Sequence, residues 1–111
     1  YMICEIIREK ALLFLQDEIP HGIGVYIQTM VYDGGLANID VDIICEKESH
    51  KSIIIGEKGS KLKTIGERAR ADIEKLLGTK VYLKLFVKVR EDWRNKHNVL
   101  RDIGYDKKKN L

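Results

Sequence analysis

A short segment at residues 53–66, IIIGEKGSKLKTIG, holds the residues of this chain that are best suited to bind an anion. It places two glycines, Gly56 and Gly59, three positions apart, between an apolar run and a lysine-bearing stretch. Glycines let a main chain approach a phosphate without Cβ clashes, and a helix that begins nearby offers free N–H groups to a negative charge. The segment is therefore a candidate phosphate-binding loop.

Two nucleotide-binding loops do not fit this spacing. A Walker A loop needs four residues between its glycines, and its lysine is followed by serine or threonine. Here two residues separate Gly56 from Gly59, and Ser60 precedes Lys61 instead of following it. The dinucleotide fingerprint also fails, because no G-x-G stands at this position. Two interpretations are left: a GxxG loop that admits a sugar-phosphate backbone, or an ordinary corner between two helices.

Positive charge gathers around this loop. The 111-residue chain carries a formal net charge of +3, and the window 47–63, with five lysines and two glutamates, accounts for all of it. Lys61 and Lys63 fall in the expected first turn of a helix, where the helix dipole favours acids over lysines. A local preference violated in this way is typical of a functional site, and it favours nucleic acid as the ligand.

Helical periodicity predicts the element that follows the loop. Residues 60–77 carry one apolar stripe of an amphipathic helix, and Gly78 is expected to end it. Residues 50–55, before the loop, are too short to assign and could continue a strand or form a short helix. Members of the predicted apolar stripe are Leu62, Ile65, Ala69, Ile73 and Leu76.

Two more helices are predicted at the ends of the chain. Residues 2–16 carry apolar side chains at helical spacing, and the pattern stops before Pro20. A last helix is predicted over residues 92–103, and the lysine-rich tail 106–111 is expected to be flexible.

Three strands are predicted from the alternation of apolar and polar residues. Residues 23–32 and 38–46 flank a DGG turn, which predicts an antiparallel hairpin, and residues 81–90 form the third strand. A crossover through the long helix would make the third strand parallel to the second. The result is an α+β domain with a three-stranded mixed sheet and helices packed on one face. The expected core-facing residues of the first strand are Ile23, Val25, Ile27 and Val31.

Outside the loop, few residues suggest chemistry. Phe86 and Trp93 are candidates to stack on nucleic-acid bases, although simple packing is the favoured interpretation of both. The three histidines lack metal-ligand spacing, and we identify no paired carboxylates or nucleophile–base set. Neither a metal site nor a catalytic site is therefore predicted. Cys4 and Cys45 form no CxxC and are expected to be reduced packing residues of a cytosolic protein.

Taken together, the GxxG loop, the isoleucines before it and the helix after it resemble a K-homology (KH) domain, whose GxxG loop clamps about four nucleotides of a single strand. Two strands before the loop and one after it are similar to the type II arrangement. The resemblance extends to the C-terminal region of the Era family of GTPases and covers about residues 5–105. Three stretches carry it: EIIREKALLFLQDEIPHGIGV, IIIGEKGSKLKTIGERARADIEKLLGTKVYLKLFVKVREDW and LRDIGY.

This resemblance implies an RNA-binding function. Family members join an N-terminal GTPase domain to a KH domain that binds single-stranded 16S ribosomal RNA near its 3′ end, and they assist maturation of the small ribosomal subunit. They are cytoplasmic and partly associate with the inner membrane surface. The expected organisation is a KH domain at residues 1–105, with its flanking helices, and a tail at 106–111. The GTPase domain is missing from this chain, so neither catalysis nor a cofactor is expected here; GTP and Mg would belong to that domain.

The family motif also implies a binding site. The GEKG residues would form the clamp, isoleucines before it an apolar groove wall, and lysines after it the phosphate contacts, while the second strand would supply the other wall. DNA is not an expected partner. The alternative is a KH-fold protein-interaction or regulatory domain with weak or no RNA binding. The predicted RNA-binding residues are Ile54, Ile55, Gly56, Glu57, Lys58, Gly59, Ser60, Lys61, Leu62 and Lys63.

Overall fold

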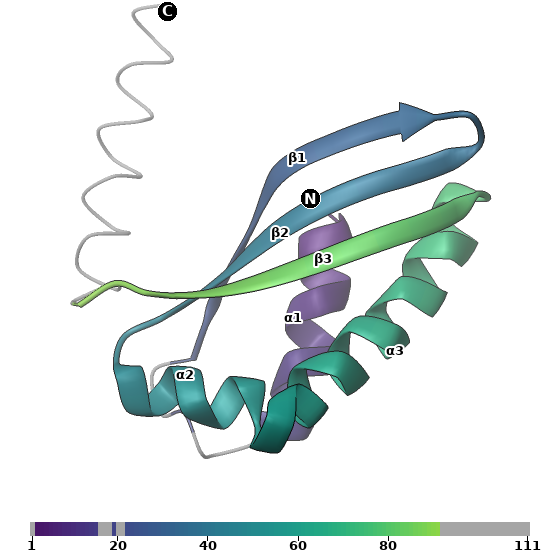
Figure 1. Ribbon diagram of the computed structural model, residues 1–111. Coiled ribbons are helices and arrows are strands. Elements are labelled where there is room, and N and C mark those ends of the chain that lie inside the picture. Colours follow the sequence, from purple (N-terminus) through teal and green to yellow (C-terminus); the bar gives the residue numbers. More distant parts are fainter. Residues whose placement is uncertain (1, 16–18, 20–21, 92–111) are drawn as a thin grey trace, which may run out of the picture.

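The computed structural model describes residues 2–15, 19 and 22–91 of the chain (Figure 1). The last helix predicted at 92–103 and the tail at 106–111 lie outside these residues. The elements, in chain order, are α1 (Met2–Leu15), β1 (Gly24–Asp33), β2 (Leu36–Cys45), α2 (Glu48–Ile55), the 3-10 turn η2 (Glu57–Gly59), α3 (Ser60–Leu77) and β3 (Lys80–Val89).

The three strands form one mixed sheet. Their order is β1-β2-β3, with β1 antiparallel and β3 parallel to the central strand β2. The helices α1, α2 and α3 lie together on one face of this sheet (Figure 1). The predicted α+β architecture is therefore confirmed, including the parallel crossover through α3.

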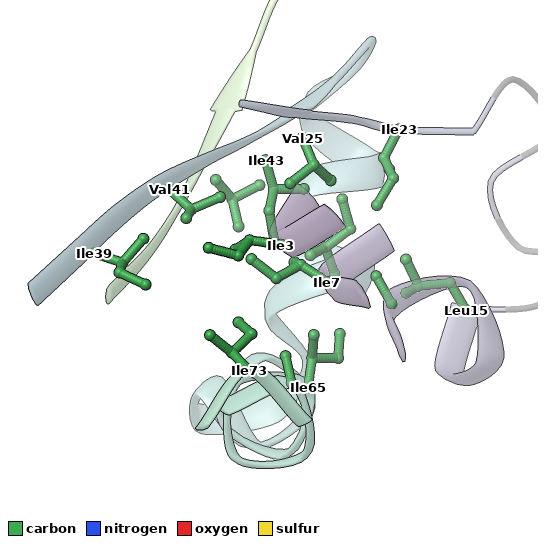
Figure 2. Close-up of a cluster of buried hydrophobic side chains, with 14 of the residues drawn as sticks. Ile3, Ile7, Leu15, Ile23, Val25, Ile39, Val41, Ile43, Ile65 and Ile73 are labelled. Atoms are coloured by element: carbon green, nitrogen blue, oxygen red, sulfur yellow. The ribbon is translucent and has the colours of Figure 1, made fainter. Parts of the chain in front are cut away.

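The core lies between the sheet and the helices and is built mainly of isoleucine (Figure 2). The inward side chains of β2, such as Ile39 and Ile43, meet Ile7 of α1 and Ile65 and Ile73 of α3. Each of these side chains is fully buried, which contributes about 1.5–3 kcal/mol of transfer free energy per residue. This cluster holds α3, and with it the loop that precedes α3, against the sheet.

The inward face of β1 differs from the prediction in its second half. The pairing of β1 with β2 shifts register between Ile27 and Thr29, which leaves Gln28 as an extra residue. Because such a bulge shifts the alternation by one residue, Met30 packs toward the core and Val31 is 57% exposed. The prediction that Val31 faces the core is wrong for this reason.

The segment before the loop, which the sequence alone did not assign, is helical. Residues 50–55 belong to α2, which ends where Gly56 adopts a φ of 75°. The helix α3 has the predicted bounds, and Gly78 ends it in the left-handed conformation. One member of the predicted stripe, Leu76, is exposed, and the neighbouring Leu77, four residues after the buried Ile73, packs against the core in its place.

Candidate nucleic-acid interface

The GEKG segment forms a tight turn between α2 and α3. Three of its four residues have a positive φ: Gly56 (75°), Lys58 (56°) and Gly59 (76°). Lysine is rarely found in this region, and strained backbone of this kind is concentrated at ligand sites and switches. The turn therefore holds Lys58 at its exposed tip in a conformation that local propensity does not favour.

The two glycines of the turn serve different purposes. A Cβ atom on Gly56 would lie 2.7 Å from the Cβ atom of Lys61, so this glycine lets the turn pack against the first residues of α3. A Cβ atom on Gly59 would meet no atom within 4 Å. The main chain at Gly59 thus faces open space, and a ligand backbone can approach it closely.

The start of α3 carries positive potential. Its first turn has no acidic residue and no side-chain cap, so the dipole of the helix is not neutralised there. Lys58 and Lys63 are exposed beside it, whereas Lys61 is half-buried with its Cβ against Gly56. Glu57 is exposed as well, so the turn carries one acid among these cations.

A groove of about 370 Å³ begins at the turn and runs between α3 and β3. Its floor is apolar, since Leu62, Leu83 and Leu85 are half-buried against the core. Charged side chains of α3 stand along one side. The lining residues are Gly59, Leu62, Lys63, Gly66, Glu67, Arg70, Tyr82, Leu83 and Leu85.

The second wall of this groove is β3, and the prediction that β2 supplies it is wrong. β2 is the central strand, and its residues Ile43 and Ile44 are buried, whereas β3 lies at the edge of the sheet next to α3. Only an edge strand can offer both side chains and unpaired main-chain groups to a groove.

The main-chain groups of β3 that do not pair with β2 face α3. The N–H of Val81 donates to Oε2 of Glu74 on α3 at 2.9 Å, and therefore points away from β2. Main-chain groups of alternate residues in a strand point the same way, and β3 pairs with β2 without a break in register. Leu83 and Leu85 thus present their peptide N–H and C=O groups toward the groove.

The predicted site residues are placed unevenly around this groove. Gly59, Leu62 and Lys63 line it, and Lys58 stands at its mouth in the turn. Ile54 does not line a surface, because its side chain is 0% exposed within the core, and Ile55 is half-buried and packs against that core. Ser60 is exposed at the start of α3.

Three residues of α3 that line the groove, Gly66, Glu67 and Arg70, are absent from the prediction. They follow Gly59 and Lys63 at intervals of three and four residues, which is the spacing of one helix face. This face could have been found by extending the loop motif along the helix. Gly66 keeps the groove open, since a Cβ atom there would lie 3.5 Å from Cδ1 of Leu85.

The part of the chain that the structure describes shows no group of three or more potential metal ligands. In the same residues, no helix is both long and apolar enough to span a membrane.

Comparisons with known proteins agree with this fold. The family described as KH domain matches residues 18–94 of the chain. GTPase Era of Clostridium botulinum is 53% identical over 109 residues, which are 97% of this chain and 37% of that protein. GTPase Era of Alkaliphilus oremlandii is 57% identical over 107 residues, which are 95% of this chain and 36% of that protein. The chain therefore spans little more than a third of the length of these relatives.

Two solved structures are similar in fold and sequence. A crystal structure of an Aquifex aeolicus Era variant bound to GDP and AlF4 has a TM-score of 0.84 and 42% identity, and the match covers 94% of this chain and 36% of that one. A crystal structure of Era in complex with MgGDPNP and nucleotides 1506–1542 of 16S ribosomal RNA has a TM-score of 0.83 and 42% identity. This match covers 93% of this chain and 35% of that one.

Proposed function

This chain belongs to the KH domain family and corresponds to the C-terminal KH domain of the Era GTPases, and from that premise we propose that it binds single-stranded RNA in the groove between α3 and β3. The observation that carries the proposal is the GEKG turn at the mouth of the groove. There, the open main chain of Gly59, the exposed Lys58 and the uncapped start of α3 meet. The ribosomal RNA in the similar Era structure supports 16S RNA as the ligand.

The groove offers each part of a nucleotide a different partner. The RNA backbone passes over Gly59, where Lys58 and the first turn of α3 attract its phosphates. The bases turn inward onto the apolar floor, and the peptide groups of Leu83 and Leu85 bond to their polar edges. A KH groove of this kind holds about four nucleotides.

The decisive variant combines Glu57→Asp with Lys58→Asp. It replaces the cation at the tip by an anion, while aspartate tolerates the left-handed conformation that Lys58 adopts. We expect affinity for nucleotides 1506–1542 of 16S RNA to fall at least about tenfold at low salt, and circular dichroism to stay unchanged. Unchanged affinity in this variant would show that the turn is not the site.

The matched control is Lys75→Asp. This variant makes the same lysine-to-aspartate change at an exposed position near the C-terminal end of α3, far along the helix from the GEKG turn. It should leave RNA affinity within about twofold of the parent, apart from the general effect of net charge.

Calorimetry that detects no single-stranded RNA binding to the parent chain at low salt would instead favour the protein-interaction alternative.

We further propose that this domain acts as the RNA-binding part of an Era-like GTPase that assists maturation of the small ribosomal subunit. Support comes from the relatives, whose sequences are nearly three times as long and are named GTPase Era. GTP, Mg, a cytoplasmic location and peripheral contact with the inner membrane belong to this proposal for the whole protein. The groove residues themselves would contribute RNA binding and no hydrolytic chemistry.

A further inference from the structure

The outward face of β3 carries a regular pattern of side chains, of which only Tyr82 also lines the groove. Tyr82, Lys84 and Phe86 alternate with the core-facing residues and point away from the helices. Tyr82 is 53% exposed and Phe86 is 45% exposed. None of the helices in the described residues covers this face of the sheet (Figure 1).

The pattern presents aromatic rings and a cation together. Nζ of Lys84 lies 5.2 Å from the centroid of the Tyr82 ring. Tyr82 and Phe86 are four residues apart on one strand, which separates their Cα atoms by about 13 Å. Two rings with a flexible cation between them suit a nucleic-acid strand, since bases stack on the rings and the cation binds a phosphate.

The acidic residues on the same face that lie nearest to β3 are on the central strand, away from the free edge. Asp40 and Asp42 of β2 stand beside Lys84 and Phe86 in the sheet register. Asp42 is buried, and its Oδ2 accepts hydrogen bonds from Nε2 of Gln28 and Nζ of Lys88, both at 2.7 Å. The outward residues Tyr82, Lys84 and Phe86 therefore form an aromatic and cationic strip along the edge of the sheet.

This strip is continuous with the groove. Tyr82 lines the groove and also belongs to the outward face of β3. Since β3 is the edge strand, the groove lies on one side of it and the strip on the other. A strand of RNA that leaves the groove at Tyr82 reaches the strip by crossing a single β-strand.

We propose that Tyr82, Lys84 and Phe86 form a second contact for the same RNA, on which nucleotides beyond the groove stack. The inference rests on the proposed function of the groove. RNA fits the strip better than a protein does, because protein interfaces are depleted in lysine while nucleic-acid surfaces combine lysine with aromatic rings. On binding, the Lys84 ammonium swings from the Tyr82 ring to a phosphate and leaves the ring to a base.

The test compares two single-stranded RNA oligomers taken from nucleotides 1506–1542 of 16S RNA, a tetramer that fills only the groove and a dodecamer that extends beyond it. Phe86→Ala in the 111-residue chain should weaken dodecamer binding by about five- to a hundredfold, because base stacking on an aromatic ring is lost. Its tetramer affinity should stay unchanged. Phe86→Trp keeps a stacking ring and should restore dodecamer binding.

The matched control is Tyr32→Ala, which removes an exposed aromatic side chain from β1 at the other edge of the sheet. It should leave the affinity for both oligomers unchanged. Equal dodecamer affinity of Phe86→Ala and the parent would overturn the inference and leave the strip to a protein partner. Equal weakening for both oligomers would also overturn it, since the effect would then arise in the groove. Failure of the parent to bind either oligomer would refute the proposed function and this inference with it.

Discussion

A Cβ atom on Gly56 would lie 2.7 Å from the Cβ atom of Lys61 and 3.0 Å from its amide nitrogen. Real nonbonded carbon atoms do not approach so closely, and the obstructing atoms belong to the first turn of α3, which cannot move freely. Gly56 is thus required by the internal packing of the GEKG turn, whether or not RNA is present. Gly59, three residues later, has no such neighbour.

This difference predicts unequal costs for two alanine substitutions. Gly59→Ala places a Cβ at a positive φ without a clash and should lower the free energy of unfolding by about 1–2 kcal/mol. Gly56→Ala adds the contact with Lys61 to a greater backbone strain, because Gly56 (φ 75°, ψ 179°) lies in a region that is essentially restricted to glycine, and should lower it by about 2–4 kcal/mol. Urea denaturation of both variants without RNA measures the difference. A smaller loss for Gly56→Ala than for Gly59→Ala would contradict the packing role.

The Asp42 carboxylate on the outer face of the sheet depends on its two donors. Lys88→Met removes the cation and leaves a buried carboxylate with Gln28 as a donor, and should destabilise the chain by about 1–3 kcal/mol. Adding Asp42→Asn removes the negative charge and should recover part of this loss. The measurement is thermal unfolding at neutral pH. No recovery in the double variant would show that the loss has another cause.

The ion pair between α1 and α3 predicts a dependence of stability on pH. Nζ of Lys10 lies 2.8 Å from Oδ2 of Asp72, and this hydrogen bond lowers the pKa of Asp72 and raises the pKa of Lys10. The Asp72 contribution is present above the unfolded carboxyl pKa of about 3.9 and is lost as the pH falls through the lower folded value. The Lys10 contribution is present below about pH 10.4 and is lost as the pH rises through its raised folded value.

Asp72→Asn should therefore have a slightly lower Tm than the parent at pH 7, and the difference should shrink toward pH 2. Both side chains are partly exposed, so the effect is small and decreases with added salt. Thermal scans across this pH range measure it. A Tm difference that is the same at pH 2 and pH 7 would rule out the ion pair as its source.

The two free cysteines should differ in reactivity. Cys45 is fully buried, and desolvation raises the pKa of its thiol, whereas Cys4 is half-buried on α1. Because the thiolate is the reactive form, a thiol reagent at pH 7.5 should label Cys4 first and Cys45 only after unfolding. Mass spectrometry of the labelled peptides separates the two sites. Equal labelling rates in the native chain would show that the core around Cys45 opens readily.

Periodicity along the chain was sufficient to predict the helix at residues 60–77 and the alternation of the third strand, because both patterns arise from contacts with a single apolar surface. The bulge at Gln28 could not be predicted in the same way. An extra residue in one strand is defined only by the pairing with its partner, and this pairing exposes Val31.

The sequence by itself determined the GEKG turn, the cations around it and the helix that follows, because glycine spacing and charge are local properties. Only the tertiary structure decided what surrounds the turn. It buries Ile54 in the core and makes β3 the edge strand beside α3. As a result, Leu83 and Leu85 of β3 and residues of α3 as far as Arg70 complete the groove. The physical reason is that a groove needs two walls from distant parts of the chain, and strand order in a sheet is set by the packing of the whole core.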